Sequence, residues 1–438
     1  MGVIEELQAG IDNGQIKWNR ELKNEFSCKE FHSKEETVNS ITLGDNLEYM
    51  KWLLKKGYGG KINLIYIDPP FFTKAKYDAT IKLTDDEGKN KSVKHLAYDD
   101  VYDGELSVYA ENITARLLAM KELLSDEGLI WVHLDWHSSH YVKVLMDEVF
   151  GSKRFENEVI WTYKSGGTGK RHFSRKHDTL LVYSKTKDYY FKVPKEKSYN
   201  RGLKPYRFKG VKEYRDEMGW YTMVNMKDVW HLNMVGRTSA ERNGYATQKP
   251  ESLLKRIIEC STKPGDLCAD FFCGSGSLLA AADSLERKFI GCDREKLAIA
   301  TAKKRLDNLG TDYYYYLTNC NSYIMDDFKV IVKNTMKLES DAVLVTLRIK
   351  RFNPNINLND VVKGDREFIK NLSEESPIEL LDYLLIDDNY NGKEFVATEI
   401  VDDISNEIKV IAKGNLGIIG VDSFGNEYID VIYKEGFK

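Results

Sequence analysis

The apolar run at residues 62–67 (INLIYI) constrains the fold of this chain more than any other feature. It is almost uninterrupted, and it stops at Asp68, Pro69 and Pro70. Runs of this length are typical of strands that are buried on both faces of a parallel sheet. A second such run, LIWVHL at residues 129–134, follows a segment with helical periodicity. The sequence therefore predicts a sheet whose two faces are both covered by helices.

Predicted strands and helices alternate through most of the chain before residue 310. Apolar runs predict strands at residues 40–44, 62–67, 129–134, 159–163, 179–183, 267–272 and 288–292. Helical periodicity marks residues 46–56, 109–124, 141–150, 250–261, 277–284 and 294–309. This alternation favours a doubly wound, mostly parallel α/β sheet. From about residue 331 a small β-rich domain is predicted, with strands at residues 343–348, 395–400, 408–412, 416–421 and 427–432.

Length and composition suit a globular protein of two or three domains. The 438 residues are 42% hydrophobic and 30% charged, which excludes a disordered chain. No apolar stretch reaches the ~18 residues that a membrane helix needs, and residues 1–19 lack the apolar segment of a signal peptide. The six cysteines form no CxxC pair, as expected of reduced thiols. We therefore expect a cytoplasmic protein with no membrane partner.

The net charge of −4 hides a strongly basic segment. Residues 161–250 contain 20 Lys and Arg but only 8 Asp and Glu, and aromatic residues are interleaved among them. Such a segment is expected where a protein contacts nucleic acid, although a solvated charged face has the same composition. The segment also interrupts the alternation of strands and helices, which indicates an inserted domain.

The tetrapeptide Asp68-Pro69-Pro70-Phe71 stands where the first buried strand ends. Ligands of open α/β sheets bind beyond the carboxyl ends of the strands, so these residues point to the site. The Asp68 carboxylate and a backbone carbonyl near Pro69 can accept the N–H bonds of an exocyclic amine and stabilise its developing positive charge. The prolines stiffen the backbone, and Phe71 offers a base a stacking surface. The alternative is a strand stopped by proline, with a solvated Asp.

A second motif, DFFCGSG at residues 270–276, ends another buried strand and begins a helix. Gly274 and Gly276 permit a tight turn and close approach of a ligand, and the helix N-terminus favours a carboxylate. Leu279 stands at the third glycine of the dinucleotide fingerprint, so a pyrophosphate ligand is disfavoured. Asp293 ends the next strand, where it is placed to bind ribose hydroxyls.

Together these motifs resemble the β group of DNA amino-methyltransferases, most closely the modification subunits of type III restriction systems and related solitary adenine methyltransferases. The family's catalytic motif, Asp/Asn-Pro-Pro-Tyr/Phe, matches residues 68–71, although Phe71 lacks the hydroxyl of the commoner Tyr. Its FxGxG motif for S-adenosyl-L-methionine (AdoMet) matches residues 272–276. Within the stretch from about residue 40 to 310, further matches are GDNLEYM (44–50), VHLDWHSSHYVKVLMDEVFG (132–151), RKHDTLLVYSK (175–185) and TQKPESLLKRII (247–258).

The resemblance implies a circularly permuted, Rossmann-like methyltransferase fold in which the catalytic half precedes the AdoMet-binding half. The domains would be residues 1–160 (an N-terminal extension and the catalytic half), 161–247 (a target-recognition insert), 248–330 (the AdoMet-binding half) and 331–438 (the C-terminal β-rich domain). Asp45 would contact the adenine of AdoMet, and residues 248–250 would close over its methionine. The implied AdoMet-binding residues are Asp45, Gln248, Lys249, Pro250, Asp270, Phe272, Cys273, Gly274, Ser275, Gly276 and Asp293.

The activity implied is methyl transfer from AdoMet to N6 of an adenine that is rotated out of duplex DNA, without a metal. S-adenosyl-L-homocysteine is the second product, and the catalytic residues are Asp68, Pro69, Pro70 and Phe71. The insert would bind DNA through Lys164, Lys170, Arg171, Arg175, Lys176, Arg201, Lys204 and Arg207.

Two other functions stay open: N4-cytosine methylation, whose enzymes more often carry Ser in place of Asp68, and a catalytically silent DNA-binding specificity subunit. The family also suggests a homodimer and a separate restriction subunit as partners, in a bacterial or archaeal cell. The DNA recognition sequence is not readable from the insert.

Two further patterns are interpreted as structural. His133, His137 and His140 lie on different predicted elements with no Cys or second cluster nearby, so we do not expect them to bind a metal. The segment SGGTGK at residues 165–170 lacks the spacing of a phosphate-binding loop and is interpreted as a flexible basic loop.

Overall fold

The computed structural model describes residues 2–23, 25–32, 37–84, 88–100, 105–167, 169–236, 238–245, 247–318, 323–324, 327–338, 342–404 and 407–437. Within these residues the central sheet has eleven strands, in the order β12 (Val229–His231), β7 (Phe155–Thr162), β8 (His177–Ser184), β6 (Leu124–Leu134), β3 (Ile62–Ile67), β13 (Leu267–Asp270), β14 (Lys288–Asp293), β2 (Ser40–Leu43), β15 (Tyr313–Thr318), β1 (Phe26–His32) and β20 (Phe395–Val396). The strands from β6 to β15 are all parallel, as the apolar runs predicted.

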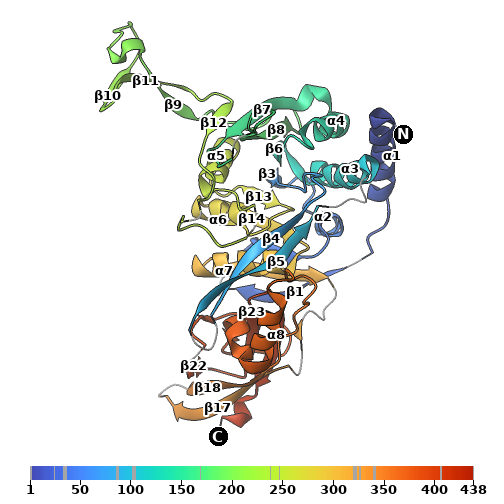
Figure 1. Ribbon diagram of the computed structural model, residues 1–438, viewed down its shortest axis with the longest axis vertical. Coiled ribbons are helices and arrows are strands. Elements are labelled where there is room, and N and C mark those ends of the chain that lie inside the picture. The colour runs from blue at the N-terminus through green and yellow to red at the C-terminus, as the bar shows by residue number, and fades with distance from the viewer. Residues whose placement is uncertain are drawn as a thin grey trace.

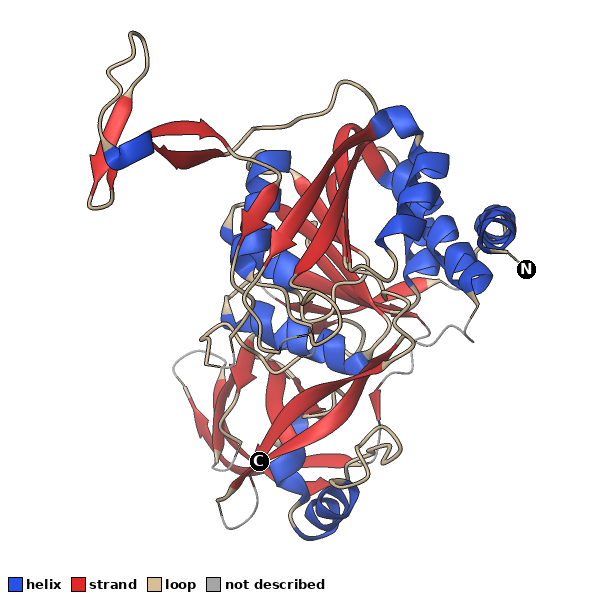
Figure 2. Ribbon diagram, turned by 45° about the horizontal axis from the view of Figure 1, so that its top comes forward, coloured by secondary structure: helices blue, strands red, loops and turns tan. Residues whose placement is uncertain are grey.

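Helices cover both faces of the central sheet (Figure 2). One face packs against α2 (Asn46–Lys55), α3 (Leu106–Leu123) and α4 (Ser139–Phe150), and the other against α5 (Glu251–Ser261), α6 (Ser277–Ser284) and α7 (Lys296–Asn308). The helix α1 (Val3–Trp18), which the sequence analysis did not predict, packs against α3. Burying the apolar stripe of each helix against a sheet face removes it from water and stabilises this layered arrangement. The predicted doubly wound α/β fold is confirmed.

In the central sheet, strands from the later part of the chain lie between strands from the earlier part. Strands β13 and β14 lie between β3 and β2, so the chain runs from β3 toward β6 in one direction and from β13 toward β14 in the other. Strand order therefore reverses between β3 and β13, where Leu64 pairs with Cys268 and Ile65 with Ala269. Such a reversal leaves a crevice beyond the carboxyl ends of the two strands, which is where open α/β sheets bind ligands.

The basic segment contributes both to the central sheet and to a separate arm. Strands β8 and β12 belong to the sheet, whereas β9 (Lys195–Tyr199), β10 (Glu213–Asp216) and β11 (Gly219–Asn225) form a three-stranded sheet of their own. This arm projects far from the rest of the molecule (Figure 1). The predicted insert at residues 161–247 thus includes sheet strands as well as the arm, and the division into domains stays a prediction.

The described part of the C-terminal region is β-rich and also contains the α-helix α8 (Arg366–Glu375), which the strand pattern did not predict. Its strands are β16 (Tyr323–Ile324), β17 (Phe328–Lys337), β18 (Val343–Phe352), β19 (Leu381–Asp387), β21 (Glu399–Val401), β22 (Ile408–Ala412), β23 (Leu416–Asp422) and β24 (Glu427–Ile432). A hairpin of β4 (Lys76–Thr84) and β5 (Asn90–Asp99), also unpredicted, shares a hydrophobic core with this region. Among the described residues, no helix has the length and apolar character needed to cross a membrane.

Candidate active site

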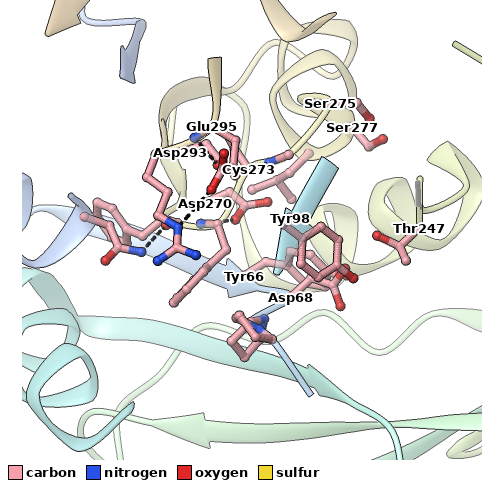
Figure 3. Close-up of a pocket in the computed structure, with 18 of the residues that line it drawn as sticks. Tyr66, Asp68, Tyr98, Thr247, Asp270, Cys273, Ser275, Ser277, Asp293 and Glu295 are labelled. Atoms are coloured by element: carbon pink, nitrogen blue, oxygen red, sulfur yellow. Dashed lines mark hydrogen bonds and ion pairs between the residues drawn. The ribbon is translucent and has the colours of Figure 1, made fainter. Parts of the chain in front are cut away.

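The carboxyl ends of β3 and β13 open onto one pocket (Figure 3). The turn after β3 brings residues 68–71 to it, and the glycine turn after β13 brings residues 272–275. Of the predicted catalytic and AdoMet-binding residues, those that line this pocket are Asp45, Asp68, Pro69, Pro70, Phe71, Gln248, Lys249, Asp270, Phe272, Cys273, Gly274, Ser275 and Asp293. Gly276 and Pro250 lie directly beside this lining without forming part of it.

The glycine turn has a conformation that side chains would obstruct. Gly274 and Gly276 have φ of 48° and 71°, in the left-handed region that favours glycine. A Cβ on Gly276 would lie 2.8 Å from Cβ of Ala302 on α7. Asp293 closes the turn, because its Oδ2 accepts a hydrogen bond from the Gly274 amide at 2.9 Å and its Oδ1 accepts one from the Glu295 amide at 3.0 Å. The backbone conformation and the Asp293 carboxylate therefore fix the turn, and its backbone faces the pocket.

Three carboxyl groups gather on the side of the pocket next to this turn. Figure 3 shows Asp270, Asp293 and Glu295 close together there. Burial raises the pKa of all three, and for Asp270 repulsion from Asp68 and Asp293 adds to the effect and places its pKa well above the usual range. A cation entering this part of the pocket would relieve that repulsion, so the cluster favours a positively charged ligand.

The two carboxylate oxygens of Asp68, in the turn after β3, differ in their partners. Its Oδ2 forms an ion pair with the ammonium group of Lys249, while its Oδ1 is buried and has no hydrogen-bond partner within the described part of the chain. The carbonyl of Pro70 accepts a hydrogen bond from the Tyr109 hydroxyl at 3.0 Å, which anchors the turn to α3. A buried acceptor without a donor is costly, so Oδ1 is suited to receive a donor from a ligand.

Phe71 rests on a buried polar network. Its ring stacks on the His133 ring with centroids 6.2 Å apart. His133 Nδ1 is 2.9 Å from the Tyr66 hydroxyl and its Nε2 is 3.0 Å from the Asp178 carboxylate. Both ring nitrogens are thus occupied by protein groups, which fits the structural role predicted for this histidine. The described residues contain no group of three His, Cys, Asp or Glu arranged to hold a metal.

Two residues that the sequence analysis missed join the two halves of the site. Asn46 donates from Nδ2 to the carbonyl of Phe271 at 2.6 Å and accepts from Arg116 Nε at 2.6 Å. Arg116 also forms an ion pair with Asp45 at 2.9 Å, and Asp45 caps α2 through the amides of residues 47 and 48. Asn46 lies in the GDN segment that pointed to Asp45, but no local pattern marks Arg116 on α3.

The hairpin of β4 and β5 and the segment before α5 provide further side chains that line the pocket. Tyr98 and Thr247 form a hydrogen bond and both line the pocket, as does Tyr245. Tyr98 and Tyr245 come from segments without a recognisable motif, whereas Thr247 begins the TQKPESLLKRII match, from which only residues 248–250 were predicted to line the site.

None of the eight predicted DNA contacts lines the pocket. Five lie in the connection between β7 and β8, and Arg201, Lys204 and Arg207 are exposed on the arm. Arg175 stacks its guanidinium group 3.6 Å from the centre of the Trp136 ring. The predicted DNA contacts therefore form two separate basic surfaces.

Comparison with known proteins places this site in a family. The family model for DNA methylases matches residues 62–304. The type II methyltransferase M.EcaI of Enterobacter cloacae is 29% identical over 61% of this chain and 69% of its own length, and M.HinfI of Haemophilus influenzae is 29% identical over 61% and 68%. The crystal structure of M1.HpyAVI in complex with SAM is 20% identical, covers 61% of this chain and 98% of that chain, and has a TM-score of 0.40.

The family match spans more than half of the chain, from the start of β3 into α7. It therefore includes both turns that meet in the pocket. The two relatives are named type II enzymes, whereas the sequence resemblance drew on type III subunits. The predicted DNA amino-methyltransferase family and the Rossmann-like α/β fold are confirmed, and this chain belongs to the family of DNA methylases.

Proposed function

We propose that this chain transfers a methyl group from AdoMet to N6 of adenine in duplex DNA. The observation that carries the proposal is the meeting of two turns at the reversal of strand order. One presents the unpartnered Oδ1 of Asp68, and the other presents the open backbone of Gly274. An acceptor for an amine and a cradle for a cofactor thus face one pocket.

The residues present fit AdoMet. Its sulfonium and ammonium charges suit the side of the pocket where Asp270, Asp293 and Glu295 gather. The glycine turn has no side chain at Gly274, and it leads into the N-terminus of α6, which favours the methionine carboxylate. When bound there, AdoMet supplies an electrophilic methyl group.

The chain's own residues would make the base amine reactive. Asp68 accepts an N–H bond of the amine and stabilises the positive charge that develops on its nitrogen. Phe71 stacks on the base, a contact worth roughly 1–3 kcal/mol, and its own position is set by His133. With the base held in this way, its amine nitrogen would take the methyl group that AdoMet supplies, S-adenosyl-L-homocysteine would leave, and the nitrogen would release its extra proton to solvent. Alignment of the two substrates provides much of the acceleration.

Adenine is favoured over cytosine because Asp68 occupies the first position of the catalytic motif, where N4-cytosine enzymes more often carry Ser. The silent-subunit alternative is disfavoured because Asp68 and both glycines of the turn are present and lie at one pocket. The basic surfaces on the loop and on the arm would hold the DNA, through contacts to phosphates. The homodimer and the restriction subunit stay predictions of the resemblance.

Two measurements test the proposal. Purified protein is incubated with plasmid DNA and AdoMet that carries a tritiated methyl group, and DNA from a host that expresses the chain is read by single-molecule sequencing. We expect tritium in the DNA and N6-methyladenine at a defined site. N4-methylcytosine at that site would overturn the assignment to adenine, and absence of tritium transfer would favour the silent subunit.

A further inference from the structure

A basic loop leaves the central sheet at the same edge as the catalytic turn. It comprises residues 163–167 and 169–176 of the connection between β7 and β8. Strands β7 and β6 both run antiparallel to β8, and β6 runs parallel to β3. The loop therefore leaves the sheet at the edge where β3 delivers Asp68.

A short chain of contacts joins the root of this loop to the catalytic turn. The hydroxyl of Tyr163 donates to Asp178 Oδ1 at 2.9 Å, and Oδ2 of the same carboxylate is 3.0 Å from His133 Nε2. His133 in turn stacks on Phe71. Buried networks of this kind restrict the positions of their members, so the loop has a defined origin beside the base-stacking ring.

The loop is also braced close to the strands that it connects. Arg175 stacks on Trp136, which follows β6, and the ammonium group of Lys176 donates to the carbonyl of Ser165 at 3.0 Å. Beyond these braces, in the distal part of the loop, the Phe173 side chain has an exposed fraction of 98%, the highest among the large apolar side chains of the described residues.

A single exposed apolar side chain is common on protein surfaces and by itself indicates nothing. Phe173 differs because of what surrounds it. The loop contains no Asp or Glu, and five cations precede or follow Phe173 in its sequence: Lys164, Lys170, Arg171, Arg175 and Lys176. An aromatic ring among cations matches a ligand that has stacked apolar bases between phosphates, which is nucleic acid.

We propose that Phe173 inserts into the DNA base stack at the position that the target base leaves, while the loop cations hold the flanking phosphates. This inference rests on the proposed function, because a base must leave the helix to reach Asp68. Rotation of a base exposes the faces of its neighbours, and an inserted aromatic ring replaces part of the stacking that is lost. Phe173 therefore stabilises the opened duplex rather than the reacting groups.

The test compares two synthetic duplexes that carry the site mapped by sequencing. In one the target base is paired, and in the other it faces an abasic position, so that it is already unpaired. Single-turnover methyl transfer is measured for the wild-type chain and for Phe173→Ala. We expect the variant to be about tenfold slower on the paired duplex, as the loss of one stacking contact implies, and close to wild type on the abasic duplex.

Matched variants separate the possible outcomes. Phe173→Leu keeps an apolar wedge and should retain most of the rate, and Tyr433→Ala removes another exposed aromatic ring, 66% exposed in the C-terminal region, and should change neither rate. An equal loss on both duplexes, or no loss at all, would overturn the wedge. If the wild-type chain itself methylates neither duplex, it is the proposed function that fails.

Discussion

The ammonium group of Lys249 forms an ion pair with the carboxylate of Asp68, although 181 positions separate the two residues in the sequence. The same ammonium lies 5.6 Å from the centre of the Phe71 ring. Under the proposed function, the amine of a target base approaches this carboxylate and this ring. We therefore propose that Lys249 also holds the Asp68 carboxylate in place, and its closure over the methionine of AdoMet stays a prediction of the resemblance.

Replacement of Asp68 with Ala should abolish methyl transfer and leave AdoMet binding largely intact. Removal of one preorganised transition-state contact commonly costs at least about a hundredfold in turnover. Methyl transfer is measured with tritiated AdoMet, and AdoMet affinity by calorimetry. Asp68→Asn, whose amide oxygen can still accept an N–H bond as in relatives that carry Asn at this position, should retain more activity than Asp68→Ala. Normal turnover in Asp68→Ala would exclude the assigned role.

Lys249→Met should lower turnover by about tenfold or more, because Asp68 loses its charged hydrogen-bond partner. AdoMet affinity should change little. The comparison is Lys255→Met, which removes a lysine whose ion pair with Glu251 on α5 lies outside the pocket. If Lys249→Met weakens AdoMet binding while turnover at saturating AdoMet stays normal, closure over the cofactor would be its role instead.

AdoMet should bind more tightly as pH rises through the elevated pKa of Asp270. Burial, with the neighbouring carboxylates of Asp68 and Asp293, raises the pKa of Asp270, and the charge of Lys249 opposes this shift. A cationic ligand favours the carboxylate and lowers its pKa, so binding releases a proton and strengthens with pH. Calorimetry across a pH series measures this slope.

Asp270→Asn should flatten that slope. S-adenosyl-L-homocysteine, which lacks the sulfonium charge, should show a weaker dependence in the unmodified chain. An unchanged slope in the variant would place the titration on another group of the pocket.

Gly276→Ala should destabilise the fold and weaken AdoMet binding. The new Cβ meets Ala302 at 2.8 Å, and the positive φ is unfavourable for any other residue. Gly265→Ala is the matched control, since Gly265 also has a positive φ but nothing lies within 4 Å of its added Cβ. Backbone strain alone costs about 1–2 kcal/mol, so urea unfolding should show a larger loss for Gly276→Ala than for Gly265→Ala. An equal loss of unfolding free energy in both variants would mean that α7 shifts to accommodate the new Cβ at no energetic cost.

Neutralisation of the arm should reduce the salt dependence of DNA binding. The triple replacement of Arg201, Lys204 and Arg207 by Gln should lower the slope of log K against log salt by up to about 3, because each phosphate contact releases about 0.9 counterion. Fluorescence anisotropy with a labelled duplex gives the slope. Replacement of three exposed lysines of the C-terminal region, Lys350, Lys363 and Lys409, serves as the control and should leave the slope unchanged. An unaffected slope in the arm variant would remove the arm from the DNA interface.

Local patterns predicted the elements whose burial follows a simple period. Helix α6 occupies the predicted residues 277–284, since its apolar positions and the glycine turn before it are all local signals. Helix α1 was missed although it contains 16 residues. Its Gly10 and Gly14 lower helix propensity, yet in the structure they let it approach α3 so closely that an added Cβ would meet Ala110 and Thr114. That gain exists only when α3 is present.

Strand boundaries show the same limit. The predicted strand at residues 395–400 is two strands, because β20 pairs with β1 in the central sheet and β21 pairs with β19 in the C-terminal region. A period of two residues marks an extended segment but carries no information about its partner. The same reason explains why Arg116 could not be recognised, since its role comes from Asp45 and Asn46 on another helix.

By itself, the sequence determined which residues could do chemistry: the acidic turn after one apolar run and the glycine turn after another, each readable within a few positions. Only the tertiary structure decided that β13 pairs with β3, so that Asp68 and Gly274 face one pocket. The pairing of parallel strands depends on burial of both sheet faces under helices from the whole chain. The free energy of that burial comes from distant segments, so a local sequence pattern cannot predict the pairing.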